Sequence, residues 1–154
     1  MRTNESENTN EILNDLIKIN NDRIAGYERA LSEMRNEDGD LRSTFEHMKA
    51  ESEGYKSELV GYVNTHGGDV EDDTTIAGKI YRAWMEVKNV FTGGERKELL
   101  DSCEFGEDAA QRAYEAALSN DAQIDANARQ LIEDQQRSLK ESHDTIKRLR
   151  DSGR

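Results

Sequence analysis

The chain contains no proline and only one cysteine among its 154 residues. Without proline, a helix can run for many turns without a built-in kink. A single cysteine, Cys103, excludes an intramolecular disulfide and is compatible with a reducing compartment. No apolar segment has the length of a signal-peptide core or a transmembrane helix. These absences predict a cytoplasmic protein built from long helices.

Aromatic residues are also few, at 6%, whereas charged residues make up 35% of the chain and hydrophobic residues 34%. This balance is typical of long helices with solvated outer faces and not of a β-sandwich. The formal net charge of −12 repels phosphate groups, so we expect the chain to bind neither nucleic acid nor an anionic membrane. An acidic surface also suits cation attraction, although solubility alone explains it.

Apolar residues that recur at steps of three and four predict helices along most of the chain. Four long helices are expected at residues 10–35, 41–65, 95–118 and 122–149, and a short one at residues 75–91. Residues 1–9 are expected to form a disordered tail before a single domain at residues 10–151. The predicted inward side chains are Ile24, Leu31, Phe45, Leu59, Trp84, Tyr114, Leu139 and Ile146.

The connections between these helices predict the topology. Short turns near residues 36–40 and 119–121 make two antiparallel hairpins. The segment at residues 67–94 separates the hairpins, and its own helix can return the chain along a bundle roughly 38 Å long. The expected fold is therefore all-α, a ferritin-like antiparallel four-helix bundle with a long crossover that contains a short fifth helix. A homodimer formed through Leu16, Val60 and Leu100 is a further expectation.

Several segments carry a resemblance that covers nearly the whole chain. They are GYERA at residues 26–30, TIAGKIYRAW at 75–84, CEFGED at 103–108 with YE at 114–115, and SHDTIKRLRD at 142–151. These segments resemble an uncharacterised bacterial family of ferritin-like four-helix-bundle proteins. The resemblance implies the ferritin-like fold, and it implies no activity, because none is established for that family.

One carboxylate stands where an apolar residue is expected. Glu107 lies in the middle of the stripe Leu99, Cys103, Glu107, Ala110, Tyr114 and Ala117. A buried carboxylate is costly without a partner. The stripes expected on the other long helices also carry polar residues, namely Asn21 and Glu28, Ser52 beside Glu51, and Gln136 with His143. Counted from the two hairpin turns, Glu28, Glu51, Glu107 and Glu133 lie within roughly two helical turns of one another in height.

This layer matches part of a carboxylate metal site. Ferritin-like sites take one Glu from each of two helices and Glu-x-x-His from each of the other two. Here the histidine positions, three residues after each Glu, hold Gly54 after Glu51 and Gln136 after Glu133. His47, one turn before Glu51, could replace one histidine. The candidate metal ligands are Glu28, Glu51, Glu107, Glu133, Gln136 and His47. Their oxygen-rich set favours Mg, Ca or Mn, with Fe as the ancestral metal.

Two other interpretations remain open. The layer could be a buried polar network in which Asn21, Ser52, Tyr55 and Gln136 supply hydrogen bonds, or its carboxylates could reach solvent at the stripe edges. No catalytic nucleophile and base, and no cofactor site, can be named from spacing. His143 is expected to be a hydrogen-bonded core residue. The chain is therefore either a bundle with a degenerate metal site or a non-catalytic structural or interaction bundle related to stress, whose protein partner the sequence does not identify.

Overall fold

The computed structural model describes residues 4–70, 96–119 and 124–152. These residues form four long helices and one short 3-10 helix: α1 Asn4–Glu33, η1 Asn36–Asp38, α2 Gly39–Thr65, α4 Arg96–Ser119 and α5 Ala126–Ser152. No strand occurs in the described part of the chain, so the predicted all-α four-helix bundle is confirmed. The helix predicted at residues 75–91, with Trp84, lies outside the described residues.

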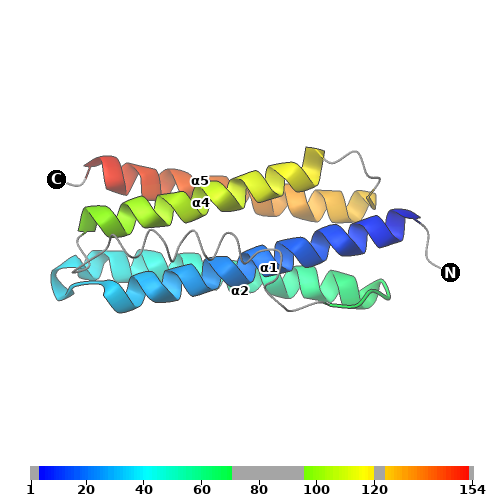
Figure 1. Cartoon of the computed structure of the whole chain (residues 1–154), viewed down its shortest axis with the longest axis horizontal. Coiled ribbons are helices and arrows are strands. Elements are labelled where there is room, and N and C mark those ends of the chain that lie inside the picture. The colour runs from blue at the N-terminus through cyan, green and yellow to red at the C-terminus, as the bar shows by residue number, and fades with distance from the viewer. Residues whose placement is uncertain (1–3, 71–95, 120–123, 153–154) are drawn as a thin grey trace.

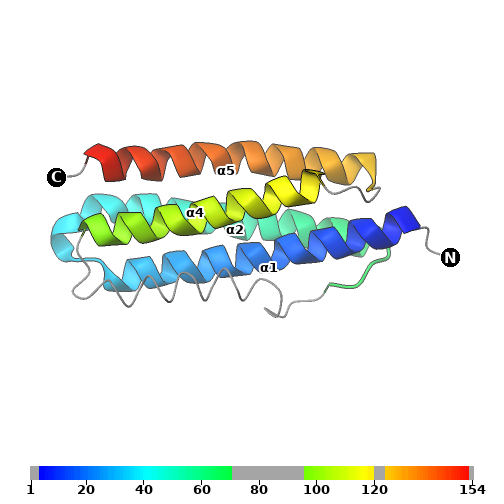
Figure 2. The same cartoon turned by 45° about the horizontal axis from the view of Figure 1, so that its top comes forward.

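The four helices pack as two antiparallel hairpins, α1 with α2 and α4 with α5 (Figure 1). Helix α1 also packs along α4, whereas α2 touches α5 much less. Helix α2 ends and α4 begins at opposite ends of the bundle (Figure 2), which is the placement that a long crossover between two hairpins requires. Among the helices described, none combines the length and the apolar character needed to cross a membrane.

Helix α1 begins earlier than expected. It starts at Asn4 instead of residue 10, so residues 4–9, which we expected in the disordered tail, are helical. Thr9 lies inside this helix and is buried. Its hydroxyl oxygen accepts a hydrogen bond of 2.9 Å from the backbone N–H of Asp125, just before α5. This contact attaches the first turns of α1 to the neighbouring hairpin.

Helix α2 ends as the sequence predicts, at Thr65 before two glycines. Gly67 has a φ of 75°, a left-handed conformation that favours glycine. The N–H of Gly68 donates to the carbonyl oxygen of Val63 at 2.9 Å, and the N–H of His66 donates to that of Tyr62 at 3.1 Å. Together with the N–H of Gly67, which donates to Asn64, these groups satisfy three of the last carbonyl groups of the helix.

The core consists of two apolar clusters at different heights of the bundle. Leu13, Ile17, Leu59, Tyr114, Ile132 and Leu139 belong to one cluster, and Tyr27, Phe45, Met48, Leu99, Cys103 and Ile146 belong to the other. On each helix, a buried polar residue lies between the two clusters in the sequence. These residues are Arg23 on α1, Ser52 on α2, Glu107 on α4 and Ser142 on α5. The polar layer thus divides the core.

The buried stripe on α4 is confirmed at all six predicted positions. Five predicted inward residues, Phe45, Leu59, Tyr114, Leu139 and Ile146, are also buried. The expected dimer surface is wrong, because Leu16 and Leu100 are buried in the core of the single chain. The homodimer itself stays a prediction.

The stripes predicted on α1 and α5 are wrong by one residue over part of their length. Helix α1 buries Asn20, Arg23, Tyr27 and Ala30, whereas Asn21, Ile24 and Leu31 are only partly buried and Glu28 is exposed. Helix α5 buries Gln135 and Ser142 in place of Gln136 and His143, and α2 buries Val63 in place of Tyr62. These shifts change which polar side chains meet in the centre.

Candidate functional site

The guanidinium of Arg23 lies in the middle of the polar layer, with its side chain only 2% exposed. Its Nε and Nη2 atoms donate to Oε2 of Glu107 at 3.0 and 2.7 Å. Nη2 also donates to Oε1 of Glu51 at 3.1 Å. Nη1 donates to the hydroxyl of Ser52 at 2.8 Å and to the carbonyl oxygen of Met48 at 3.2 Å. The guanidinium therefore makes five hydrogen bonds, one for each of its N–H groups, to four oxygen atoms.

Glu107 is fully buried and forms the anionic centre of the layer. Its Oε2 accepts from Arg23 and also from the hydroxyl of Tyr27. Its Oε1 is buried and has no hydrogen-bond partner. The Tyr27 ring lies 5.8 Å from the Phe45 ring and 5.3 Å from the Arg23 guanidinium carbon, centroid distances that fit aromatic and cation–π contact. One carboxylate oxygen thus receives three hydrogen bonds while the other receives none.

Burial and charge fix the protonation of the groups around this centre. Burial alone would lower the pKa of Arg23. The nearby carboxylates of Glu107 and Glu51 raise it by a larger amount, so the net pKa lies above the ordinary value. Burial, assisted by the Glu107 carboxylate, raises the pKa of Tyr27 and of Cys103 well above their ordinary values. The guanidinium therefore stays charged at neutral pH, and the Cys103 thiol lacks the thiolate character that a nucleophile needs.

The hydrogen bonds continue from Arg23 through the bundle. The Ser52 hydroxyl donates to Oδ1 of Asn20 at 2.8 Å, and Nδ2 of Asn20 donates to the Tyr114 hydroxyl at 2.9 Å. The Tyr114 hydroxyl donates to Oε1 of Gln135 at 2.7 Å, and Nε2 of Gln135 donates to Glu58 at 3.0 Å. Side chains from all four long helices therefore share one network, as in the second interpretation of the sequence.

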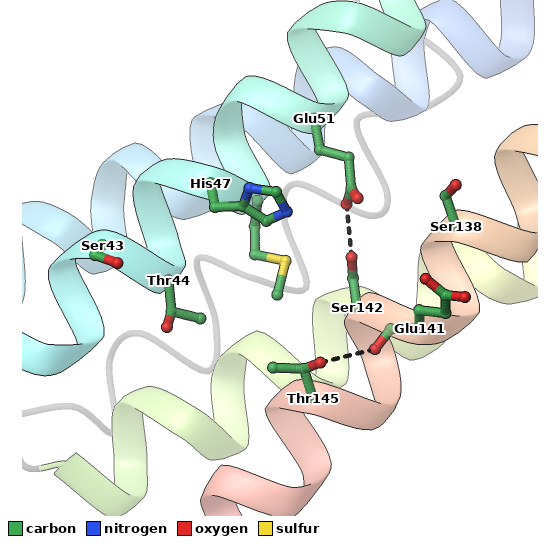
Figure 3. Close-up of a pocket in the computed structure, with 9 residues that line it drawn as sticks. Ser43, Thr44, His47, Glu51, Ser138, Glu141, Ser142 and Thr145 are labelled. Carbon is green, nitrogen blue, oxygen red and sulfur yellow. Dashed lines mark hydrogen bonds between the residues drawn. The ribbon is translucent and has the colours of Figure 1, made fainter.

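A groove of about 370 Å³ between α2 and α5 reaches this network from solvent (Figure 3). It is lined by Ser43, Thr44, His47, Met48, Glu51, Ser138, Glu141, Ser142 and Thr145. Figure 3 shows Glu51 and Ser142 pointing toward each other from the two helices, and the Ser142 hydroxyl donates to Oε1 of Glu51 at 2.6 Å. The same oxygen accepts from Arg23, so Glu51 is the residue at which the buried layer meets the groove.

The structure does not bring the six candidate metal ligands together. Glu51 and Glu107 meet, but around Arg23. Glu28 is 56% exposed and pairs with Lys49 at 3.3 Å. Glu133 and Gln136 line a different groove, between α4 and α5, and His47 lines the α2–α5 groove. The one-residue shifts on α1 and α5 explain the positions of Glu28 and Gln136, because each shift turns a side chain by about 100° around its helix.

Arg23 is the central residue that the sequence analysis missed. A signal for it exists: Leu13, Leu16, Asn20, Arg23, Tyr27 and Ala30 recur at alternating steps of three and four. The prediction instead followed the parallel line through Ile24 and Leu31, whose apolar members are all Ile or Leu and therefore more hydrophobic than Tyr27 and Ala30. Of the predicted network residues, Ser52 is confirmed, and Asn20 and Gln135 take the places expected for Asn21 and Gln136.

A second cluster of polar side chains lies where α4 meets α5, outside the central layer. Glu104, Asp108 and His143 each offer one potential ligand atom, and these atoms lie within 4.8 Å of one another. Nε2 of His143 is 2.5 Å from Oδ1 of Asp108. His143 was expected in the core, but it is 17% exposed and contacts carboxylates on both sides of its ring.

Comparison with known proteins gives a family without a function. The family model described as Domain of unknown function (DUF2383) matches residues 8–120. The matched segment contains Arg23, Glu51 and Glu107 and ends before α5 begins. No curated protein matches the chain.

Proposed function

Because this chain belongs to DUF2383, a family whose function is unknown, we propose its function from its own central layer. It is a non-catalytic structural or interaction bundle of the ferritin-like type, in which the Arg23 guanidinium replaces the metal ions. The two hairpins, with α2 ending and α4 beginning at opposite ends, support the ferritin-like assignment. The observation that carries the proposal is the position of Arg23 between Glu51 and Glu107.

The charges in the layer favour this function over metal binding. Two like unit charges 4 Å apart repel by about 4 kcal/mol at an effective dielectric constant of 20. A divalent ion on Glu107 would repel the guanidinium by roughly twice that energy. The positive charge of Arg23 already compensates the negative charges of these carboxylates. Its N–H groups are all hydrogen-bonded within the layer. The network therefore connects the four helices and stabilises one register of the helices relative to one another.

Binding of a cation in the layer is the second candidate, and one observation favours it. Oε1 of Glu107 is buried and accepts no hydrogen bond, so its lone pairs are available to coordinate a cation. That oxygen nevertheless belongs to the carboxylate that Arg23 holds. A weak cation site would require Arg23 to move away from Glu107.

The decisive experiment replaces the internal cation. Arg23→Met should lower the free energy of unfolding by about 3–5 kcal/mol, because it leaves the Glu107 carboxylate buried without its partner. The double variant Arg23→Met, Glu107→Leu should recover most of that loss. Arg112→Met removes an exposed arginine from α4 and should change stability by no more than about 0.5 kcal/mol. Urea unfolding followed by circular dichroism measures all four proteins.

A metal titration separates the two candidates. In the proposed function, Fe(II) or Mn(II) does not stabilise the central layer, and Fe(II) oxidation is no faster than in buffer. A metal-dependent rise in melting temperature that disappears in Glu107→Gln would contradict the proposal, since ligands of the folded state stabilise it. A rise that persists in Glu107→Gln comes from another part of the molecule.

A further inference from the structure

We propose that Glu104, Asp108 and His143 bind one divalent transition-metal ion on the surface where α4 meets α5. This site is separate from the Arg23 layer and does not depend on the function proposed for it. Its three residues come from two helices that form one hairpin. The site would take an ion such as Zn²⁺ with a water molecule as a fourth ligand.

The helix geometry places the three ligands. Glu104 and Asp108 are four residues apart on α4, so their carboxylates lie one above the other on the same face. His143 reaches them from α5. The three ligand atoms lie within 4.8 Å of one another, a spacing from which small side-chain rotations can bring each to about 2.0–2.2 Å from a shared ion.

The burial of the side chains suits a partly preorganised site. Glu104 and His143 are 13% and 17% exposed, so packing restricts both, whereas Asp108 is 44% exposed. The site is therefore open to solvent on the Asp108 side. Three protein ligands and one open position are typical of zinc sites that keep a bound water.

The imidazole of His143 is oriented by carboxylates at both of its nitrogens. Nδ1 lies 3.3 Å from Oδ1 of Asp144, and Nε2 lies 2.5 Å from Oδ1 of Asp108. A histidine that binds a metal usually donates its other ring N–H to a carboxylate or carbonyl group. At 2.5 Å, Nε2 donates a proton to the Asp108 carboxylate in the metal-free protein. A bound ion would take the place of that proton between Nε2 and Asp108, while the Nδ1 N–H stays directed to Asp144.

The ligand set also determines which ions are expected. Imidazole nitrogen favours transition metals, whereas Mg²⁺ and Ca²⁺ prefer oxygen ligands alone. Arg150 is the internal competitor, because its guanidinium pairs with Glu104. Arg150 also pairs with Asp151 at 2.9 Å, so it retains a partner when Glu104 turns to the ion. Removing Arg150 should therefore strengthen metal binding.

Calorimetric titration of the full chain with Zn²⁺ tests the proposal. One ion should bind the wild type, and His143→Ala should weaken binding by at least about tenfold, since even outer-shell changes at metal sites cost 10–100-fold. Asp108→Asn, at an exposed position, should weaken it as well and protects the test against misfolding of the first variant. Arg150→Met should tighten binding. The matched controls are His47→Ala and His66→Ala, which remove the exposed histidines of α2 and its C-terminus and should leave Zn²⁺ affinity unchanged.

Competition by Mg²⁺ distinguishes this site from attraction to an acidic surface. A large excess of Mg²⁺ should leave Zn²⁺ binding at the site intact. The proposal is overturned if the wild type does not bind Zn²⁺, if His143→Ala and Asp108→Asn both bind it as tightly as the wild type, or if Mg²⁺ displaces it at equal concentration. Circular dichroism of each variant confirms that the helices are retained.

Discussion

Arg23 forms hydrogen bonds with residues of α2 and α4 while its own backbone belongs to α1. Removing such a charge from water has a cost that its partners offset only when every donor has an acceptor. The net contribution to stability is therefore small compared with apolar side chains of the same volume. The network instead favours one helix register over others, because a helix shifted by one residue would leave the guanidinium without these acceptors.

Buried phenol groups predict how stability depends on alkaline pH. Burial raises the pKa of Tyr27, Tyr55 and Tyr114 above 10, the ordinary value that applies in the unfolded chain. Above pH 10 the unfolded state loses these protons while the folded state keeps them. Stability is therefore complete below pH 10 and falls above it, by about 1.4 kcal/mol per pH unit for each tyrosine.

Tyr114→Phe isolates one of these groups. The variant should lose stability less steeply between pH 10.5 and 11.5 than the wild type, by about 1.4 kcal/mol per pH unit. Loss of the hydroxyl's hydrogen bonds adds a constant offset that does not change the slope. Urea unfolding at several pH values gives the slopes, and equal slopes for both proteins would show that Tyr114 ionises equally in the folded and unfolded states.

At the level of single helices, α4 could be predicted in full and α1 only in part. The α4 stripe is apolar at five of its six positions, so hydrophobicity alone orients the helix. Helix α1 carries two interleaved stripes, one with Ile24 and Leu31 and one with Arg23 and Tyr27. Hydrophobicity favours the first stripe. The structure buries the second, because Glu107 and Glu51 on other helices pair with Arg23.

On helix α5, too, the buried stripe could not be predicted in full, although the residues to be chosen between carry no opposite charges. Gln135 and Gln136 are adjacent, and so are Ser142 and His143. No apolar preference separates the members of either pair. The contacts that select Gln135 and Ser142 come from Tyr114 and Glu51, which are distant in sequence. The position of a polar residue along the bundle could therefore be predicted, but not its rotation about the helix axis.

The end of α2 offers a test of backbone conformation with a matched control. Gly67→Ala should lower the free energy of unfolding by about 1–2 kcal/mol, because a Cβ atom disfavours the left-handed φ of 75°. Gly61→Ala lies in the exposed interior of the same helix, where the new Cβ meets nothing within 4 Å, and should raise stability by roughly 0.5–1 kcal/mol. Thermal unfolding of both variants should give shifts of opposite sign.

For the whole molecule, the net charge of −12 dominates the surface electrostatics. Repulsion among surface carboxylates destabilises a compact chain, and salt screens it over about 10 Å at 0.1 M. Raising NaCl from 10 to 500 mM should therefore increase the melting temperature. A decrease would mean that attractive surface pairs, such as Arg96 with Asp40, outweigh the repulsion.

The connectivity of the whole bundle was easier to predict than its central site. Two short turns and one long connection are visible in the sequence and lead directly to two hairpins. The site depends on how four helices rotate against one another, and small rotations decide whether a cation or a carboxylate faces the centre. Glu107 was identified because a carboxylate inside an apolar stripe is recognisable without knowing its partner.

The reach of Arg23 across three helices also limits how this sequence can change over time. A substitution at position 23 alone leaves the buried Glu107 carboxylate without its ion-pair partner, and a substitution at position 107 alone does the same to the Arg23 guanidinium. Either intermediate would be purged before the compensating change arrives, unless both occur nearly together. Among descendants of a common ancestor, positions 23 and 107 should therefore be inherited as a pair, with position 51, which keeps some access to solvent, drifting more freely.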